Sequence, residues 1–547
     1  MPTKNVNSET FALIVGGGPV GLAAAIELNW RGVPNILITE NVETATHPKC
    51  NTTSSRSMEH FRRLGIAKEL RSEALPAELE RASAYVTRYC GHEFGRLKRA
   101  YADWPTPEIP ATISQIVLER TLRQIAESQA GAQIHFGWKL ESFTTEDDGI
   151  VAHILNVTNG ERRTIRARAL LAADGASSTV RRALGVRMIG DDDKEPRAFM
   201  GGTMLSYFIR APGLTAASGR RPSHMTWIIN PEMRAMFYAQ DGRERWVVHY
   251  QVPNGKDWRD LDPKRLVASM IGADVDFEIL SGGPWTGGLA LVAEHYQSGP
   301  VFLAGDAAHL FTPLGGLGMN TGIGDIMNLG WKLAAAYEGW AGTSLLASYE
   351  TERRPIGVRN SQLGIRCAAV MDGWETPPDF EDDTPKAEAC RAALGARAII
   401  EDQPQYRTVG LQLGERYEDS SVVCPDASPS PPDPWDIYEP LDRPGARAPH
   451  VWLKPGLSLF DACGRGFTLL GFGAPAGAAA LQSAAGQRGI PLKVLPLENI
   501  EASPYRSKLV LVRPDQHIAW HGDSVSNPLA VIDRVRGAVS ASPAGHA

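Results

Sequence analysis

A glycine-rich turn near the N-terminus constrains the fold of this chain more than any other feature. The apolar run Phe11–Val15 precedes the turn, and an apolar helix pattern over Leu22–Trp30 follows it. The intervening GGGPVG has the spacing GxGxxG, in which the first glycine permits a tight turn, the second lets a pyrophosphate approach and the third allows close helix–strand packing. This order predicts a dinucleotide-binding unit with ligand contacts from Gly16, Gly18, Pro19, Val20 and Gly21.

An acidic residue stands where such a unit needs one. A second apolar run, Asn35–Thr39, ends in Glu40, at about the expected distance of 20 residues from the turn. A carboxylate at this place binds ribose hydroxyls and disfavours a 2′-phosphate. The sequence therefore predicts Glu40 as a further contact to the nucleotide.

Two more apolar runs end in an acidic residue beside a glycine. Residues 169–173 lead into Asp174-Gly175, and Val301–Ala304 lead into Gly305-Asp306. A carboxylate at a strand end can accept hydrogen bonds from sugar hydroxyls. The competing interpretation of the second run is an ordinary strand–turn–helix crossover in which Asp306 is only solvated.

The loop after Asp306 is rich in glycine and leads to a helix pattern that starts near Asn320. Glycines let a backbone lie close to a large planar ligand, and free N–H groups at a helix start favour an anionic or electron-rich group. The predicted contacts of this segment are Gly316, Gly318, Met319 and Asn320, and Pro313 precedes them.

The motifs GGGPVG, Asp174-Gly175 and Gly305-Asp306, in this order and at these separations, resemble those of class A flavoprotein aromatic hydroxylases. The resemblance covers nearly the whole chain. It implies a single-component monooxygenase with non-covalent FAD, which hydroxylates a phenolic substrate with NAD(P)H and O2 through a flavin hydroperoxide. It also implies that Arg56 and Gln115 contact FAD. The same resemblance assigns the catalytic role to Pro313, whose carbonyl would face the substrate.

Composition excludes several other classes. The formal net charge of −6 gives no electrostatic footprint for nucleic acid, and no apolar run is long enough to span a membrane. The polar start of the chain lacks the apolar core of a signal peptide. Six scattered cysteines without a CxxC pair fit the reduced thiols of a cytoplasmic protein and predict no metal site.

The central third of the chain changes character. Strand-like runs at 198–209, 225–229, 235–239 and 246–252 are separated by turn signals and predict an antiparallel sheet inserted into the FAD domain. One face of that sheet is expected to line the substrate cavity. Core packing is an equally good interpretation of the five candidates for this lining, which are Met204, Trp227, Phe237, Tyr238 and His249.

The C-terminal part alternates strand-like and helical segments after a proline-rich stretch. It is similar to the thioredoxin-like domain of phenol-hydroxylase-type members, but the missing CxxC predicts packing or homodimerisation rather than redox chemistry. The predicted divisions are the FAD-binding domain at 1–190, the substrate sheet at 191–295, the second part of the FAD domain at 296–395, a linker at 396–450 and the thioredoxin-like α/β domain at 451–547.

Alternatives to a hydroxylase stay open at this point. A flavoprotein dehydrogenase or oxidase shares the nucleotide motifs, and a non-catalytic nucleotide-binding protein would share them too. A flavin-dependent halogenase shares the fold, but the signature WxWxIP is absent. The substrate ranges over phenols, catechols, chloro- or nitro-substituted phenols and polyketides, which includes roles in aromatic hydrocarbon catabolism. The residues do not distinguish NADH from NADPH.

Overall fold

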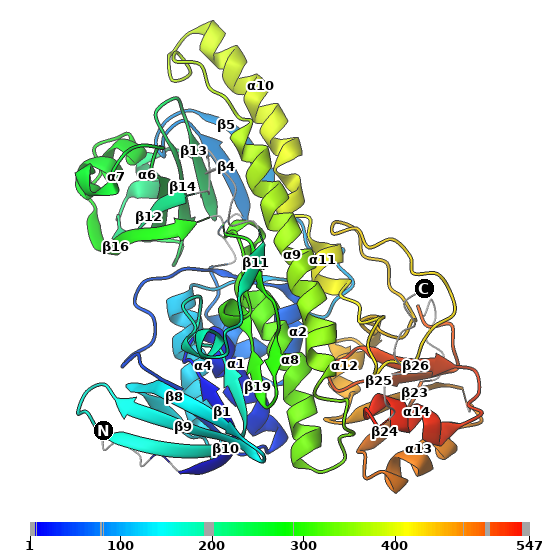
Figure 1. The fold of residues 1–547 in the computed structure, drawn as a ribbon. Coiled ribbons are helices and arrows are strands. Elements are labelled where there is room, and N and C mark those ends of the chain that lie inside the picture. The colour runs from blue at the N-terminus through cyan, green and yellow to red at the C-terminus, as the bar shows by residue number, and fades with distance from the viewer. Residues whose placement is uncertain are drawn as a thin grey trace.

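The computed structural model describes residue 6 and residues 8–76, 79, 81–190, 202–287, 289–473, 475–497 and 504–538. Figure 1 shows a mixed α/β domain that contains the N-terminal part of the chain, a separate sheet reached by the long helices α9 and α10, and a small C-terminal α/β domain beside α9. This arrangement confirms the predicted fold class.

The first domain is built on an eight-stranded sheet with the order β18-β19-β10-β1-β2-β7, to which β9 and β8 are added beside β10. Strands β19, β10, β1, β2 and β7 run parallel. The strands are β1 (Glu9–Val15), β2 (Asn35–Thr39), β7 (Ile134–Phe136), β8 (Trp138–Glu146), β9 (Gly149–Asn156), β10 (Arg162–Ala172), β18 (Gln297–Ser298) and β19 (Val301–Leu303).

Helices pack on this parallel sheet because its strands need cover on both faces. Helix α1 is buried almost throughout, begins with a proline and ends at Gly32 in the left-handed region. The helices of the domain are α1 (Pro19–Arg31), α2 (Ser55–Arg63), α3 (Ala67–Ser72), α4 (Gln115–Ser128), α5 (Thr179–Ala183) and α8 (Gly318–Tyr337). Short pairings add β3 (Thr52–Thr53), β6 (Ala111–Thr112), β11 (Met188–Gly190), β17 (Leu291–Ala293) and β20 (His309–Leu310).

The second sheet has seven strands in the order β16-β12-β15-β14-β13-β4-β5. Its strands β12 to β15 correspond to the four strand-like runs of the sequence, although the start of the first run, at 198–201, lies outside the described residues. The strands are β4 (Ala82–Val86), β5 (Glu93–Lys98), β12 (Gly202–Arg210), β13 (Met225–Ile229), β14 (Arg234–Ala239), β15 (Arg245–Gln251) and β16 (Glu278–Gly287).

Two strands of this sheet come from a part of the chain that the sequence placed in the FAD domain. Strand β4 pairs in parallel with β13, and β5 pairs with β4 in antiparallel orientation. The sheet is therefore mixed, and it is assembled from two separated stretches of sequence. The helices beside it are α6 (Leu214–Ala217), η1 (Trp258–Asp260) and α7 (Pro263–Ile271).

Long helices connect the two sheets. Helix α9 (Ser348–Asp372) rises from the FAD domain, and α10 (Pro385–Glu401) returns along β5. A Cβ atom at Gly395 would lie 1.6 Å from the carbonyl oxygen of Phe94, so only glycine permits this approach of α10 to the sheet. The chain continues through η4 (Gln403–Gln405) and α11 (Val409–Leu413).

The stretch predicted as a linker is bound rather than free. The end of α10, η4 and α11 fall within 396–450, and the proline-rich remainder is bonded to the C-terminal sheet. The N–H groups of Cys424 and Gly445 donate to the carbonyls of Ala519 and Ile518, respectively. Proline-rich composition suggested extended backbone, and it gave no sign of these long-range contacts.

The C-terminal domain contains a four-stranded sheet of order β24-β23-β25-β26. Strand β23 is parallel to β24 and antiparallel to β25, as expected for a small α/β unit. Its elements are β21 (Trp452–Lys454), β22 (Leu457–Ser458), α12 (Leu459–Ala462), β23 (Phe467–Phe472), α13 (Ala478–Gln487), β24 (Leu492–Leu497), β25 (Leu509–Val512), β26 (Ile518–Gly522) and α14 (Pro528–Val535). Among the described residues of the chain, no helix has the length and apolarity needed to cross a membrane.

Candidate functional site

The predicted nucleotide contacts gather at one edge of the first sheet. Because β1, β2, β10 and β19 are parallel, their carboxyl ends lie on the same side of the sheet. The glycine turn follows β1, Glu40 follows β2, Asp174 follows β10 and Gly305 follows β19. Ligands of parallel α/β sheets bind outside the carboxyl ends of the strands.

The glycine turn has the shape that a dinucleotide needs. A Cβ atom would lie 2.1 Å from Ala173 O at Gly16, where φ is +118°, and 1.9 Å from Gly16 O at Gly21. A Cβ atom at Gly18 would meet nothing within 4 Å, which leaves open space beside the backbone for a pyrophosphate. Pro19 begins α1, and the side chain of Val20 packs against Gly305. The residues present therefore fit the group that the sequence predicts.

The other acidic strand ends differ in their surroundings. Glu40 is exposed, and its carboxylate lies 3.7 Å from the ammonium of Lys139. Asp174 accepts a hydrogen bond from the N–H of Val180 through Oδ2, whereas its buried Oδ1 has no partner among the described residues. Gly175 has φ +82° and turns the chain at this point. Both acids stay predictions as cofactor contacts.

Asp306 lies in the 3₁₀ turn η2 (Gly305–Ala307), where its neighbours on both sides are buried and its own side chain is exposed. Its Oδ1 would be 3.9 Å from a Cβ atom at Gly318, so the carboxylate faces the start of α8. The surrounding protein raises the pKa of Asp306 by desolvation, and the nearby charges of His309 and Lys49 oppose that rise.

The loop before α8 presents backbone N–H groups. Gly315 and Gly316 in η3 (Leu314–Gly316) have φ values of +78° and +64°, which favour glycine. The N–H of Thr321 donates to Leu317 O, so the N–H groups of Gly318, Met319 and Asn320 precede the first helical hydrogen bond. This helix start is suited to an electron-rich ligand edge.

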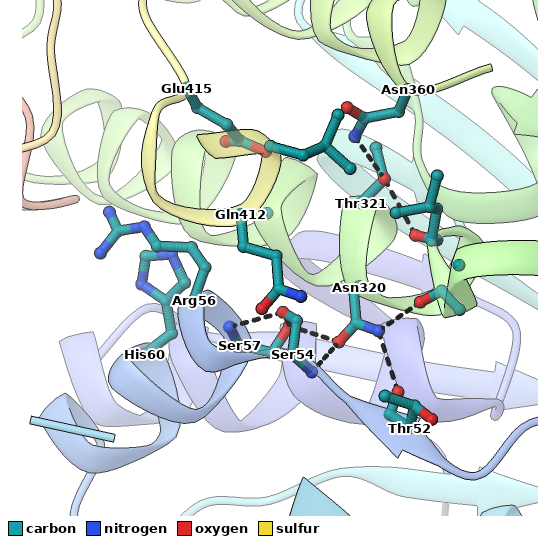
Figure 2. Close-up of a pocket in the computed structure, with 15 residues that line it drawn as sticks. Thr52, Ser54, Arg56, Ser57, His60, Asn320, Thr321, Asn360, Gln412 and Glu415 are labelled. Carbon is teal, nitrogen blue, oxygen red and sulfur yellow. Dashed lines mark hydrogen bonds between the residues drawn. The ribbon is translucent and has the colours of Figure 1, made fainter. Parts of the chain in front are cut away.

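The side chain of Asn320 is already fully used within the protein (Figure 2). Its Oδ1 accepts from Ser54 N and Ser57 Oγ, and its Nδ2 donates to Thr52 O and Gly316 O, at 2.6 to 2.9 Å. The amide therefore fixes the glycine loop to the segment before α2. Only the backbone N–H of Asn320 is left for the predicted contact to FAD.

Pro313, the predicted catalytic residue, caps the turn η3 with φ −65° and ψ −13°. Its carbonyl oxygen accepts a hydrogen bond from Gly316 N at 3.3 Å. A carbonyl oxygen has two lone pairs, so one acceptor position is left for a substrate hydroxyl. The catalytic role of Pro313 stays a prediction.

Arg56 binds three partners within the protein. Its Nη1 donates to Glu59 and to Gln516 Oε1, and its Nη2 donates to Asp515 O. The guanidinium thus joins α2 to the C-terminal domain, and its contact to FAD stays a prediction.

Arg56 also lines a small pocket that meets the glycine loop from the side of α2 and α9 (Figure 2). The pocket does not include the fingerprint glycines or Asp306 among its lining residues. These are Thr52, Ser54, Arg56, Ser57, His60, Gly315, Gly316, Leu317, Asn320, Thr321, Gly324, Asn360, Leu411, Gln412 and Glu415.

A cation that the sequence motifs did not indicate, Lys49, lies near the acidic strand end. Lys49 is near enough to Asp306 to oppose the rise of its pKa. The N–H of Lys49 donates to Gln115 Oε1 at 2.8 Å, and Gln115 in turn donates to Glu119. Gln115 therefore fixes the loop that presents Lys49. The sequence signal that could have indicated Lys49 is its position as a second cation only seven residues before Arg56.

The same loop also touches the second sheet. His47 hydrogen-bonds Ser206 Oγ at 2.8 Å and Ser281 Oγ at 2.9 Å. Cys50 lies 3.6 Å from the sulfur of Met319, and burial raises the pKa of its thiol to about 12. This loop consequently bridges the nucleotide edge and the sheet that was predicted to bind substrate.

One face of the second sheet turns toward that loop. Met204, Trp227, Tyr238 and His249 belong to this face, because they alternate with the residues of the opposite core. Burial lowers the pKa of His249 to about 3, so the imidazole is neutral at pH 7. Trp285 lies beside His249, with 5.3 Å between their ring centroids.

Phe237 was wrongly assigned to this lining. It is fully buried in the core on the other face of the sheet, 4.9 Å from the ring of Tyr89. Successive residues of a strand point to opposite faces, so Phe237 and Tyr238 cannot both face one cavity. Alternation along the strand separates the two aromatic residues, and the structure shows that Phe237 is the one in the opposite core.

Asp402, at the end of α10, supports a prediction about pH. It is buried and accepts hydrogen bonds from Tyr85 and Gln405. Burial raises its pKa from 3.8 to about 7. The folded protein thus favours the neutral acid, so the stability from this group is present below pH 4 and is lost as the pH rises through 7.

Ionisation of Asp402 should lower the unfolding free energy of the wild type by up to about 4 kcal/mol between pH 4 and 8. We expect Asp402→Asn to lack this decrease. Denaturant unfolding at both pH values measures the difference. Asp241→Asn, at an exposed turn whose backbone N–H groups bind the Asp241 carboxylate, is the control. Parallel pH profiles of the wild type and Asp402→Asn would contradict this assignment.

An edge of parallel strands that joins a GxGxxG turn, acidic strand ends and free helix N–H groups defines a dinucleotide-binding domain. Residues 9–363 match the model of the FAD binding domain, and residues 442–540 match that of the aromatic-ring hydroxylase C-terminal domain. The chain belongs to the family of FAD-dependent aromatic-ring hydroxylases.

Individual relatives agree with this assignment. The chain is 32% identical to the FAD-dependent monooxygenase apdD of Emericella nidulans, over 96% of this chain and 89% of the relative. It is also 32% identical to a phenol 2-monooxygenase of a Pseudomonas species, over 96% and 91%. The solved structure of RebC with bound 7-carboxy-K252c is 36% identical, with a TM-score of 0.88 over 97% of this chain and 99% of RebC.

Proposed function

We propose that this protein hydroxylates a phenolic aromatic ring with O2, FAD and NAD(P)H. The observation that supports it most is the loop of residues 47–50, which contacts both the nucleotide edge and the aromatic face of the second sheet. A cofactor held by Asp306 and the N–H groups of α8 would lie between these two surfaces. The named relatives include phenol and dichlorophenol monooxygenases, and polyketide hydroxylases.

FAD supplies the activation of O2 when it is bound. The residues of this chain bind and orient the cofactor and the substrate, and they exclude water from the site. The turn at Gly18 accommodates the pyrophosphate, Asp306 binds cofactor hydroxyls, and the N–H groups of residues 318–320 bind the electron-rich edge of the ring system. The second lone pair of the Pro313 carbonyl would accept a hydrogen bond from the substrate hydroxyl and thereby direct the phenol oxygen.

The face of the second sheet supplies the substrate contacts in this proposal. Within the described part of the chain, Nδ1 of His249 and Nε1 of Trp285 are buried without a hydrogen-bond partner. Unpaired buried polar atoms are costly, so an oxygenated substrate that pairs with them gains binding energy. Trp285 therefore joins Met204, Trp227, Tyr238 and His249 as a proposed pocket residue.

NAD(P)H is proposed as a transient donor. The fold has one GxGxxG turn in the described residues, and the FAD pyrophosphate is assigned to it. The donor is therefore proposed to bind at the flavin only for the transfer and then to leave again. For the C-terminal domain the proposal keeps two roles: packing within one chain, or formation of a homodimer.

The activity is tested by measuring substrate-stimulated NAD(P)H oxidation with FAD-loaded protein over a panel of phenols, chlorophenols, nitrocatechols and hydroxylated polycyclic aromatics. We expect at least one compound to stimulate oxidation and to gain one oxygen in its mass. A dehydrogenated product without added oxygen, formed with no consumption of NAD(P)H and with the electrons passed to O2 as H2O2 or to NAD(P)+, would support the dehydrogenase or oxidase alternative instead.

The two neighbours on β14 give a matched prediction for the substrate face. We expect Phe237→Leu to lower the unfolding free energy by about 1–2 kcal/mol and leave the substrate KM unchanged, because Phe237 lies in the opposite core. We expect Tyr238→Leu to raise KM severalfold with a smaller loss of stability. Steady-state kinetics and thermal unfolding of both variants measure this, and a KM change in Phe237→Leu alone would contradict the assignment of the faces.

A further inference from the structure

The turn that presents Asp306 is fixed by a single buried carboxylate. Asp325 of α8 accepts hydrogen bonds from Gly305 N at 3.1 Å and from His309 Nε2 at 2.9 Å, both through Oδ2. Gly305 precedes Asp306 and His309 follows it by three residues, so Asp325 holds the turn on both sides. Its side chain is fully buried.

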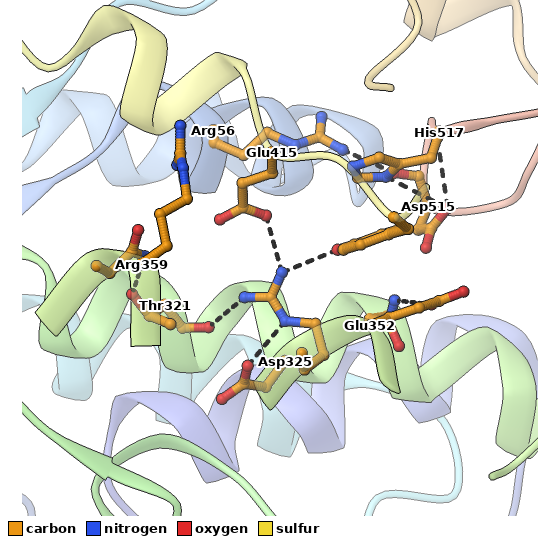
Figure 3. Close-up of polar contacts among 12 residues, drawn as sticks. Arg56, Thr321, Asp325, Glu352, Arg359, Glu415, Asp515 and His517 are labelled. Carbon is orange, nitrogen blue, oxygen red and sulfur yellow. Dashed lines mark hydrogen bonds and ion pairs between the residues drawn. The ribbon is translucent and has the colours of Figure 1, made fainter. Parts of the chain in front are cut away.

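The other oxygen of Asp325 is bound by an arginine that reaches toward the C-terminal part of the chain (Figure 3). Arg353 of α9 donates from Nε to Asp325 Oδ1 at 2.9 Å. From Nη1 it donates to Glu415 Oε2 and to the hydroxyl of Tyr417, each at 2.8 Å. Arg353 is also fully buried, so the guanidinium is held in one orientation.

Tyr417 continues the path into the C-terminal domain. Its ring stacks on His517, with 4.2 Å between ring centroids and 30° between the planes. Its N–H donates to Gly445 O, in the segment bonded to β26. Contacts therefore run without a break from the C-terminal sheet to the backbone N–H of Gly305.

The turn of the C-terminal domain at this contact is itself strongly constrained. Gln516 has φ +69°, a value that side-chain-bearing residues rarely adopt, and Arg56 donates to its Oε1 at 2.6 Å. Arg513 binds Asp515 and donates to both carboxylate oxygens of Glu352 on α9 at 2.6 and 2.8 Å. These buried charges place the turn at residues 513–517 in one position relative to α9.

Buried ion pairs are weak evidence for net stability, because desolvation opposes their attraction. Buried ion pairs nevertheless fix the relative positions of their groups, because each buried charge needs its partner within contact distance. A chain of such pairs that ends on Gly305 therefore has a positional consequence at Asp306. Looser packing of apolar side chains would hold the domains together without fixing this backbone turn.

We propose that Arg353 is a positioning residue for FAD, and that through Tyr417 it makes cofactor binding depend on the docked C-terminal domain. The inference rests on the proposed function, in which Asp306 binds the cofactor. It gives the C-terminal domain a role in the FAD site without any redox group of its own. The segment at 415–417 is the connecting part.

Arg353→Lys tests the proposal, because it keeps the charge and removes the planar fork. Flavin-fluorescence titration of the full-length apoprotein gives the FAD Kd, and thermal unfolding gives the Tm. The matched control is Arg447→Lys, a buried arginine of the same interface that pairs with Glu59 and has no contact with Asp325 among the described residues. We expect Arg353→Lys to weaken FAD binding about tenfold or more, and Arg447→Lys to change it less than about twofold.

A double-variant experiment separates positioning from general loosening. In the background Asp306→Ala, Arg353→Lys should weaken FAD binding by less than about twofold, because the group that Arg353 positions is gone. Full additivity of the two changes would overturn the proposal, as would equal weakening by Arg447→Lys. If Arg353→Lys does not fold, Tyr417→Phe replaces it, with an expected loss of about threefold and the same non-additivity.

Different results would contradict the proposed function and the positioning role of Arg353. Wild-type protein that does not bind FAD, or Asp306→Ala that binds it normally, would contradict the function itself. Normal FAD binding by Arg353→Lys in a protein whose Asp306→Ala variant binds weakly would contradict only the positioning role.

Discussion

Asp306→Ala is expected to weaken FAD binding by about 10- to 100-fold. The carboxylate is exposed at the end of β19 and faces the start of α8, where cofactor hydroxyls are assigned. Hydrogen bonds to a charged group contribute about 1.5–3 kcal/mol each, and about 1.4 kcal/mol corresponds to a factor of ten in affinity. Titration of the apoprotein with FAD measures the loss.

Two variants make the interpretation specific. Asp306→Asn keeps the shape and loses the charge, so an intermediate affinity is expected. Asp241→Ala removes an aspartate from an exposed turn of the second sheet and is expected to leave the FAD Kd unchanged. Full-strength FAD binding by Asp306→Ala would show that this carboxylate does not hold the cofactor.

Pro313→Gly is expected to uncouple NAD(P)H oxidation from hydroxylation. The proline fixes its own φ and restricts the residue before it, which holds the direction of the carbonyl assigned to the substrate hydroxyl. Misplacement by about 1 Å can cost a reaction roughly 100-fold. The variant should still bind FAD and oxidise NAD(P)H, while H2O2 rises and hydroxylated product per NAD(P)H falls severalfold or more.

Pro253→Gly is the matched control for this variant. Its carbonyl accepts a hydrogen bond from Lys256 N at 3.1 Å, three residues on, as the carbonyl of Pro313 does from Gly316. Pro253 lies two residues after the end of β15, in a turn of the second sheet. If coupling is unchanged in Pro313→Gly, or falls equally in both variants, Pro313 is only a turn residue.

The nucleotide edge was predictable because its determinants are local. The turn at Gly16, the acid at Glu40 and the pair Gly305-Asp306 each follow an apolar run within a few residues. Steric demand alone requires glycine at Gly16 and Gly21, where a Cβ atom would collide with a carbonyl oxygen. Parallel pairing then places these short motifs together.

The second sheet was only partly predictable because strand pairing is not local. The strands β12 to β15 have clear apolar runs, but nothing in the run at 82–86 indicates that it pairs with 225–229. Alternation along the strand excludes that Phe237 and Tyr238 share a face, and strand register decides which of the two lies in the opposite core. A shift of one residue reverses the face of every side chain.

Charged residues were the least predictable part of the site. Arg56 and Lys49 are seven residues apart, and no sequence pattern indicates that Arg56 binds the C-terminal domain while Lys49 lies near Asp306. Likewise Asp325, Arg353 and Tyr417 are separated by dozens of residues and meet only in the folded chain. Their roles depend on tertiary contacts alone.

Insertion of one atom of O2 into an aromatic ring can be measured by turnover of the best phenolic substrate under ¹⁸O2, with FAD-loaded protein and NAD(P)H, followed by mass spectrometry of the product. We expect a hydroxylated product that contains one ¹⁸O atom. NAD(P)H oxidation that yields only H2O2, or a product whose new oxygen comes from water, would contradict it.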